Sequence, residues 1–173
     1  MDDVRLPTPA APNRGRFSAE VPVFSSIADK LVLPNGIRMP GIGFGTWQVP
    51  ADSTLENAIS AALELGYRFI DTAQIYGNAS VIGRSLLASG LPREEVYISS
   101  KIWTSHRSYD GVMRAFTDII EQLKTPYLDQ LLIHWPATQG EPMIWQSQNA
   151  GTWRALEDLY DQGAVKVLSL IHI

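Results

Sequence analysis

The sequence predicts an α/β fold built on a parallel sheet. Short apolar runs with strand character alternate four times with stretches that have helical spacing, which is typical of βα units whose strands lie parallel. Polar residues stand at the ends of three successive strand-like runs. Parallel α/β barrels gather their catalytic side chains at this position, so the same pattern that predicts the fold also predicts where its chemistry lies.

The chain is expected to begin its ordered part with a β-hairpin over residues 31–40. Its turn is predicted at Asn35-Gly36, a strong signal for a two-residue connection. The first strand of the sheet is expected near residues 41–45. A helix is predicted to follow from Ser53, because Ser53 and Glu56 form a capping-box pattern and apolar residues then share one face until Gly66.

The remaining elements follow the same alternation. The later strands are predicted at residues 68–73, 96–102, 128–135 and, for the start of a fifth, 165–168. The helices between them are predicted over residues 79–88, 112–123 and 152–162. The last helix is expected to bury Trp153, Leu156 and Tyr160.

Four polar residues at these strand ends have complementary chemistry. Asp71 ends the second strand with Tyr76 just beyond it, Lys101 ends the third and His134 ends the fourth. A tyrosine, with a usual pKa of about 10, is a poor acid at neutral pH until a cation such as Lys101 lowers that pKa. Asp71 would hold Lys101 charged, and His134 could donate a hydrogen bond to an oxygen that becomes negative. Each residue alone also suits a structural role, but together they predict carbonyl reduction.

Four segments resemble, in the same order, motifs of the aldo-keto reductase superfamily. They read LPNGIRMPGIGFGTW, GYRFIDTAQIYGN, SSKIW and LLIHWP, and the resemblance runs from about residue 31 to residue 167. It implies a (β/α)8 barrel that moves hydride between a nicotinamide, usually NADPH with NADH possible, and an aldehyde or ketone. A complete barrel takes about 250 residues. The 173-residue chain is therefore predicted to be an incomplete TIM (β/α)8 barrel, the N-terminal half of the enzyme.

The resemblance also implies roles for individual residues. Tyr76 is implied as the general acid, tuned by Lys101 and Asp71, with His134 orienting the carbonyl. The implied cofactor contacts are Gly45, Thr46, Trp47 and Asp71. The implied lining of the substrate pocket is Trp47, Trp103, His134 and Trp135. The family usually has Glu or Gln where this chain has Ala79, so a polar contact beside the second helix is predicted to be missing.

Half a barrel should leave part of its sheet uncovered. We expect two open sheet edges and an exposed inner face. Half of the apolar residues Val96, Ile98, Leu131 and Ile133 are predicted to face the missing interior. The fragment alone is therefore expected to be inactive.

The two ends are predicted to lie outside the domain, which is placed at residues 29–167. Residues 1–28 contain several prolines and no apolar periodicity, which predicts a flexible extension without a secretory or transit signal. Residues 168–173 read LSLIHI, the translation of the transposon end CTGTCTCTTATACACATC used in sequencing libraries. We interpret this string as a translated adaptor; a genuine apolar fifth strand is the alternative.

Composition disfavours several other classes of protein. The net charge is −4 and no basic cluster is present, which argues against a nucleic-acid surface. No apolar run approaches a membrane span, and cysteine is absent, so thiolate chemistry is excluded. These features favour a soluble cytoplasmic protein, and the resemblance implies that the parent enzyme is a monomer or a weak dimer.

Three alternative functions remain to be weighed. The glycines of GIGFGTW do not open a helix, which makes a Rossmann dinucleotide site a poor interpretation. A metal-dependent hydrolase could use Asp71, His106 and His134, but the first strand supplies no histidine, so no metal is predicted. The runner-up is a barrel that binds nicotinamide as a regulatory or partner-binding subunit without turnover. Retention of all four polar residues favours the enzyme.

Overall fold

A parallel sheet of five strands forms the centre of the protein. A computed structural model describes residues 23–136 and 144–171. The sheet order follows the chain, β3-β4-β5-β6-β7, and every neighbouring pair is parallel. The strands are β3 (Phe44–Gly45), β4 (Phe69–Asp71), β5 (Tyr97–Ile102), β6 (Gln130–Ile133) and β7 (Leu168–Leu170).

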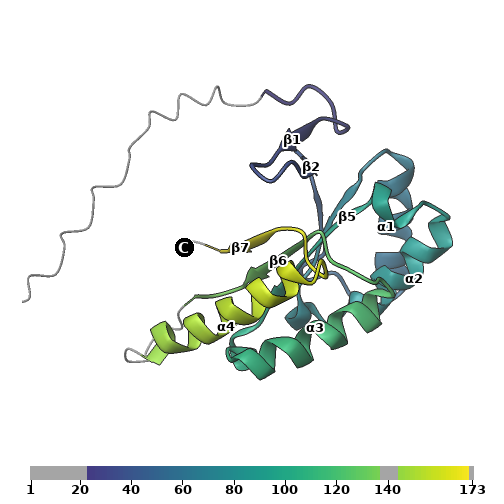
Figure 1. Ribbon diagram of the computed structural model, residues 1–173. Helices are drawn as coiled ribbons and strands as arrows, with labels where there is room; N and C mark the ends of the chain where they lie inside the picture. Colours follow the sequence, from purple (N-terminus) through teal and green to yellow (C-terminus); the bar gives the residue numbers. More distant parts are fainter. Residues whose placement is uncertain (1–22, 137–143, 172–173) are drawn as a thin grey trace, which may run out of the picture.

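Four helices connect the strands and lie together on one side of the sheet (Figure 1). They are α1 (Ser53–Glu64), α2 (Ala79–Ser89), α3 (Tyr109–Leu123) and α4 (Ile144–Asp161). Helices on one face leave the opposite face of a parallel sheet as its concave, inner side. The predicted order of four βα units followed by a fifth strand is confirmed.

The predicted hairpin is also confirmed, as β1 (Lys30–Val32) paired antiparallel with β2 (Arg38–Pro40). Gly36 has φ of 83°, a left-handed conformation that glycine adopts without strain. The side-chain amide of Asn35 donates a hydrogen bond to the carbonyl oxygen of Lys166 at 3.0 Å. The hairpin is thereby fastened to the segment that precedes β7, at the N-terminal ends of the strands.

The start of α1 differs from the prediction. Asp52, not Ser53, is the N-cap, and its Oδ1 accepts a hydrogen bond from the backbone N–H of Thr54 at 2.8 Å. Ser53 is the first helical residue, so the predicted capping box is wrong by one position. Asp and Ser are both good N-cap residues, and here they are neighbours in the chain. The sequence alone therefore does not determine which of them caps the helix. The helix ends just before Gly66, as predicted.

The last helix begins earlier than the sequence predicts, at Ile144. Leu156 is fully buried, as expected, whereas Trp153 is only partly buried and packs against the core. Tyr160 is 41% exposed, which contradicts its predicted burial. Its ring instead borders an open groove between α4 and the hairpin.

The core lies between the sheet and the helices. Four apolar residues are candidates for the side of the sheet that faces the barrel interior. All of them are instead buried in the core between the sheet and the helices: Val96, Ile98, Leu131 and Ile133. The prediction that half of them face the open interior is therefore wrong. Alternation along β5 places Tyr97, Ser99 and Lys101 on the opposite, inner face. That face is polar at the level of the strand ends.

The fifth strand lies three residues later than predicted. β7 pairs with β6 through Leu168, Ser169 and Leu170, whereas Val165 makes only an isolated bridge to Leu128. A strand position here requires only an extended, largely apolar segment, so the adaptor origin of residues 168–173 stays a prediction. Most of the predicted N-terminal extension lies outside the described residues. Within the described part of the chain, no helix has the length and hydrophobicity to cross a bilayer.

Candidate active site

The four residues predicted to carry the chemistry come from successive strand ends. Asp71 is the last residue of β4, Lys101 is the next-to-last residue of β5, and His134 directly follows β6. Tyr76 ends η1 (Gln74–Tyr76), the short 3₁₀ turn after β4. Parallel pairing brings these ends to one edge of the sheet, and the structure places the four side chains together there, as the following contacts define.

Asp71 and Lys101 form an ion pair. The Lys101 Nζ lies 2.8 Å from Asp71 Oδ1 and 2.7 Å from Oδ2, and it also donates to the carbonyl oxygen of Thr72 at 2.8 Å. The lysine side chain is 7% exposed, whereas that of the aspartate is 35% exposed. A nearly buried ammonium needs such partners, because an unpaired charge in this position would be costly. Lys101 is therefore the more firmly held member of the pair.

Tyr76 lies beside this pair and beside the histidine. Its ring centroid is 5.2 Å from Lys101 Nζ and 5.8 Å from the His134 ring centroid. The pKa of the Tyr76 hydroxyl is raised above 10.0, first because burial disfavours the phenolate and second because the Asp71 carboxylate repels it. The prediction that this pKa lies below its usual value is thus wrong. The ammonium directs its contacts to Asp71 and Thr72, which offsets its positive charge.

His134 is held in its neutral form. Its pKa is lowered from 6.5 because burial disfavours the imidazolium and because Lys101 repels it, with Asp71 opposing the change. A neutral imidazole carries one N–H and can donate a hydrogen bond at neutral pH. Nδ1 is buried without a hydrogen-bond partner in the described residues.

Two of the three predicted tryptophans flank the histidine. The Trp103 ring meets the His134 ring edge-on at a centroid distance of 5.0 Å, and the Trp135 ring lies 6.5 Å from that of Trp103. Trp135 is 40% exposed. Trp47 is 67% exposed, and no ring contact joins it to the other two within the described ranges. The structure therefore brings Trp103 and Trp135 to the site but leaves Trp47 at its margin.

The predicted cofactor residues after β3 contact the backbone of Asp71. Gly45 pairs in register with Asp71, and the backbone N–H and hydroxyl of Thr46 donate to the Asp71 carbonyl oxygen at 3.0 and 3.1 Å. A Cβ added to Gly45 would meet nothing within 4 Å, so open space lies over this strand end.

Sequence reasoning missed two further residues at the site. Asn78 is fully buried, and its Nδ2 donates to the carbonyl oxygens of Thr46 and Val49 at 2.9 and 3.2 Å. It joins the loops after β3 and β4 and is also the N-cap residue of α2. Ser99 donates a hydrogen bond from Oγ to Asp71 Oδ1 at 2.6 Å. The spacing of Ser99, two residues before Lys101 on the same face, could have revealed it.

The position of Ala79 is less informative. Ala79 is the buried first residue of α2, whose N-cap Asn78 makes no side-chain capping bond and whose first turn has no acidic residue. The amide of Asn78 is already committed to Thr46 and Val49. The predicted loss of a polar contact beside this helix stays a prediction.

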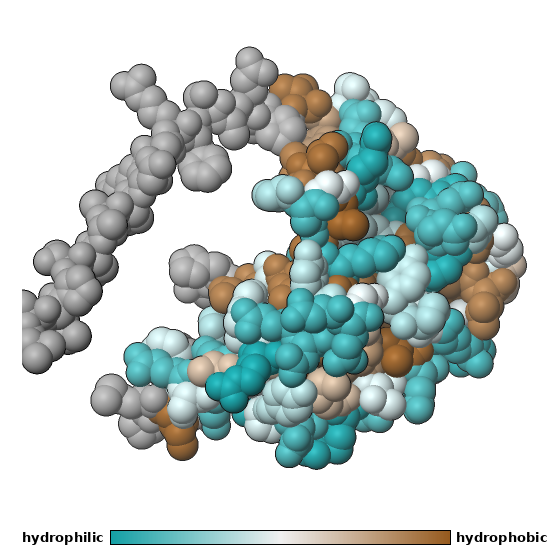
Figure 2. Space-filling model, viewed as in Figure 1, coloured by the Kyte–Doolittle hydropathy of each residue, from teal (hydrophilic) through white to brown (hydrophobic). Residues whose placement is uncertain are grey.

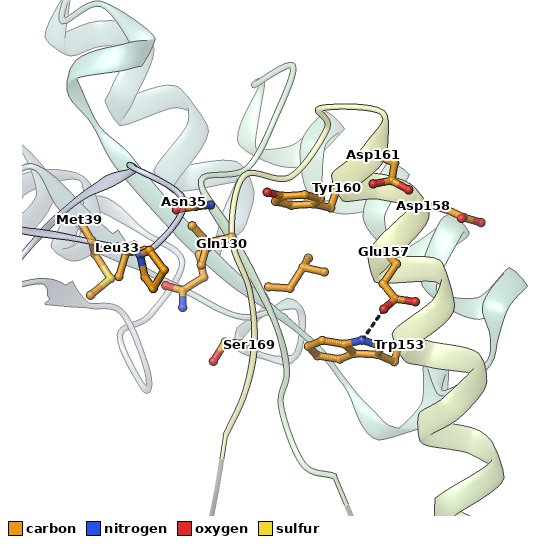
Figure 3. Close-up of a pocket in the computed structure, with 13 residues that line it drawn as sticks. Leu33, Asn35, Met39, Gln130, Trp153, Glu157, Asp158, Tyr160, Asp161 and Ser169 are labelled. Carbon is orange, nitrogen blue, oxygen red and sulfur yellow. Dashed lines mark hydrogen bonds between the residues drawn. The ribbon is translucent and has the colours of Figure 1, made fainter. Parts of the chain in front are cut away.

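A separate groove of about 810 Å³ lies away from these residues, along β7. None of the four candidate catalytic residues lines it, so we do not assign the chemistry to it. In Figure 3, Trp153 and Tyr160 point from α4 toward β7, and Leu33 and Met39 of the hairpin lie on the other side. Figure 2 shows the molecule hollowed between the hairpin and α4, with hydrophobic side chains on the hairpin and beside β7.

Known proteins that are similar to this chain belong to one family. The model of the aldo/keto reductase family matches residues 41–171. An aldo-keto reductase of Mycolicibacterium smegmatis is 37% identical over 144 residues, which are 83% of this chain and 50% of that protein. The glyoxal reductase of Bacillus subtilis is 37% identical over 146 residues, or 84% of this chain and 50% of that protein.

Solved structures give the same result. An aldo/keto reductase of Brucella melitensis matches with a TM-score of 0.74 and 35% identity, over 82% of this chain and 52% of that chain. An aldo-keto reductase from a deep-sea metagenome library matches with a TM-score of 0.74 and 38% identity, over 82% and 49%. The chain spans about half the length of the curated relatives it matches. The predicted incomplete (β/α)8 barrel is confirmed.

Proposed function

Because the chain belongs to the aldo-keto reductase family, we propose that it supplies the proton-transfer residues of an oxidoreductase that converts aldehydes or ketones to alcohols. The observation that carries this proposal is the meeting of Tyr76, His134 and the Asp71–Lys101 pair at one sheet edge. A phenol that can give up a proton there lies beside an imidazole that can donate a hydrogen bond. Both groups serve the oxygen of a carbonyl that is being reduced.

Tyr76 is proposed as the general acid. Its raised pKa keeps the hydroxyl protonated at neutral pH, so the proton to be donated is present when substrate binds. The neutral imidazole of His134 would donate a hydrogen bond to the same oxygen and fix its direction. Lys101, held by Asp71, would limit the rise of the tyrosine pKa through its positive charge. Trp103 and Trp135 would form apolar walls that exclude water.

The proposed cofactor is NADPH, with NADH possible. Gly45, Thr46, Trp47 and Asp71 would hold its nicotinamide end, and the open space over Gly45 supports this assignment. A bound reduced nicotinamide supplies the hydride that the carbonyl carbon accepts. The substrate class is a small-molecule carbonyl compound, and we propose a cytoplasmic protein that acts as a monomer or weak dimer.

We further propose that the 173 residues are the N-terminal half of that enzyme and are inactive alone. The coverage of the relatives supports this proposal, since each is about twice as long as the matched segment. The remaining strands and loops of the barrel would complete both the cofactor site and the substrate pocket.

The direct test is turnover by the full-length protein recovered from the source DNA. We expect NADPH oxidation, followed by its absorbance, when a generic aldehyde is added, together with tight cofactor binding in a fluorescence titration. A protein that binds NADPH but reduces no aldehyde or ketone would instead be the runner-up, a regulatory or partner-binding barrel. A protein that does neither would contradict both functions.

A further inference from the structure

We propose that Ser99 is a positioning residue for the reaction, which holds the Asp71 carboxylate in the orientation that pairs with Lys101. The inference rests on the proposed function and adds to it a residue that the motifs of the family resemblance did not assign. Ser99 does not touch Tyr76 in any contact that the structure defines, so its effect on catalysis would pass through Asp71.

The register of the sheet creates this contact. Ser99 on β5 lies directly opposite Asp71 on β4, and Lys101 follows two residues later on the same face. The Ser99 hydroxyl donates to Asp71 Oδ1 at 2.6 Å, which is short and typical of a hydrogen bond to an ionised carboxylate. Oδ1 thus accepts from both Ser99 and Lys101, while Oδ2 accepts from Lys101 alone.

The difference in burial makes the serine the fixed partner. Ser99 is 1% exposed, and its carbonyl oxygen also accepts the backbone N–H of Thr72 at 3.0 Å, so its place in the sheet is set on both sides. The Asp71 side chain is 35% exposed and has room to turn toward water. Without the hydroxyl, the carboxylate would be held by the lysine alone. The charge beside Tyr76 would then be less well placed.

The neighbouring serine provides a matched control. Ser100 is also 1% exposed, but it points to the other face of β5. Its hydroxyl has no hydrogen-bond partner in the described part of the chain. Replacing Ser100 by alanine removes the same atom from the same strand without touching the carboxylate. A loss shared by both variants would therefore come from packing.

The test uses the full-length protein and measures kcat, KM, the NADPH dissociation constant and the melting temperature. We expect Ser99→Ala to lower kcat about tenfold, the scale for losing a hydrogen bond to a charged group. KM and the dissociation constant should stay within about twofold, because Ser99 is 1% exposed and its hydroxyl is bonded to Asp71. Ser99→Thr, which keeps the hydroxyl, should restore kcat, and Ser100→Ala should leave it unchanged.

Coupling to the aspartate gives a second readout. In an Asp71→Ala background, Ser99→Ala should cost nothing further, since its target is gone. An undiminished kcat in Ser99→Ala, an equal loss in Ser100→Ala, a failed rescue by threonine, or a full additional loss in the double variant would each overturn the inference. If the unaltered full-length protein reduced no aldehyde or ketone, the proposed function itself would be wrong, whereas a Tyr76→Phe variant that kept its turnover would reject only Tyr76 as the acid. A silent Tyr76→Phe with an active Ser99→Ala would reject only the role of Ser99.

Discussion

The ammonium of Lys101 makes a closer contact with Asp71 than with the tyrosine it was expected to activate. Nζ lies 2.7 Å from Asp71 Oδ2 but 5.2 Å from the centroid of the Tyr76 ring. The nearest formal charges to the phenol thus form a pair of opposite sign. Burial, the larger cause, and the Asp71 carboxylate together raise the pKa of Tyr76.

Replacing the proposed acid is the first prediction. Tyr76→Phe in the full-length protein should lower carbonyl reduction by about 100-fold or more, because proton donation to the oxygen is lost. NADPH affinity should not change, since the hydroxyl serves the transition state. Turnover and cofactor-fluorescence titration measure the two effects separately. A variant that keeps most of its kcat would rule out Tyr76 as the acid.

Removing the lysine should damage both activity and stability. Lys101→Met leaves the Asp71 carboxylate uncompensated, so the pKa of Tyr76 should rise further and kcat should fall. We expect a stability loss of about 2 kcal/mol, less than for a fully buried pair because Asp71 is partly exposed. The control is Arg84→Met, which breaks the exposed pair with Glu56 and should cost about 0.5 kcal/mol or less. Urea unfolding of both variants compares them, and equal losses would contradict the prediction.

The pH dependence of reduction follows from two shifted groups. The lowered pKa of His134 places the acid limb below 6.5, and the raised pKa of Tyr76 places the alkaline limb above 10.0. Between these limits the histidine is neutral and the tyrosine protonated, so kcat should be nearly constant.

The stability of the fold should depend on pH through the same two groups. The contribution of His134 is present above 6.5 and is lost as the pH falls through its lowered pKa. The contribution of Tyr76 is present below 10.0 and is lost as the pH rises through its raised pKa. Profiles of kcat and melting temperature from pH 5 to 11 test both groups. An alkaline limb near neutral pH would show that the phenol is acidified after all.

Asn78 should matter more than its place at a helix start suggests. Asn78→Ala removes the hydrogen bonds to the carbonyl oxygens of Thr46 and Val49, and the one accepted from the Thr72 hydroxyl, and should cost about 2–3 kcal/mol. It should also weaken NADPH binding, because Thr46 loses its tether. Asn35→Ala, which removes an exposed hydrogen bond to Lys166, is the control and should cost under about 1 kcal/mol. A cost no larger than that of the control would reject the tethering role.

Residues 1–173 expressed alone should be silent and poorly folded. The outer edges of β3 and β7 have no strand partner in the described residues, and the apolar groove along β7 is open. Unpaired edges and exposed apolar surface favour association. Size-exclusion chromatography, binding of a hydrophobic dye and NADPH oxidation should be measured together. A monomer with a cooperative thermal transition and measurable aldehyde reduction would refute this prediction.

The sequence predicted the features that depend on short local patterns. The turn at Asn35-Gly36 and the order of strands and helices depend on residues close together in the chain, and the structure confirms them. The bond between Ser99 and Asp71 joins positions 28 residues apart and depends on sheet register, which no short pattern encodes. The pKa of Tyr76 depends on burial and on the position of a charge pair. These are properties of the folded site and not of the motif.

The sequence also failed to predict on which side of the sheet the apolar side chains lie. Val96 and Leu131 belong to apolar runs whose alternation predicts two faces but not which face meets the helices. That choice is made when α2 and α3 pack on the sheet. The same parity then turns Ser99 and Lys101 inward.

The hydrogen bond from Asn35 to Lys166 spans 131 positions of the chain. During synthesis on the ribosome, the hairpin is made first, yet its docking partner leaves the exit tunnel only after all four βα units have been translated. The units can assemble one by one from local contacts as they emerge. The hairpin can therefore close the N-terminal ends of the strands only about halfway through synthesis of the proposed full-length enzyme.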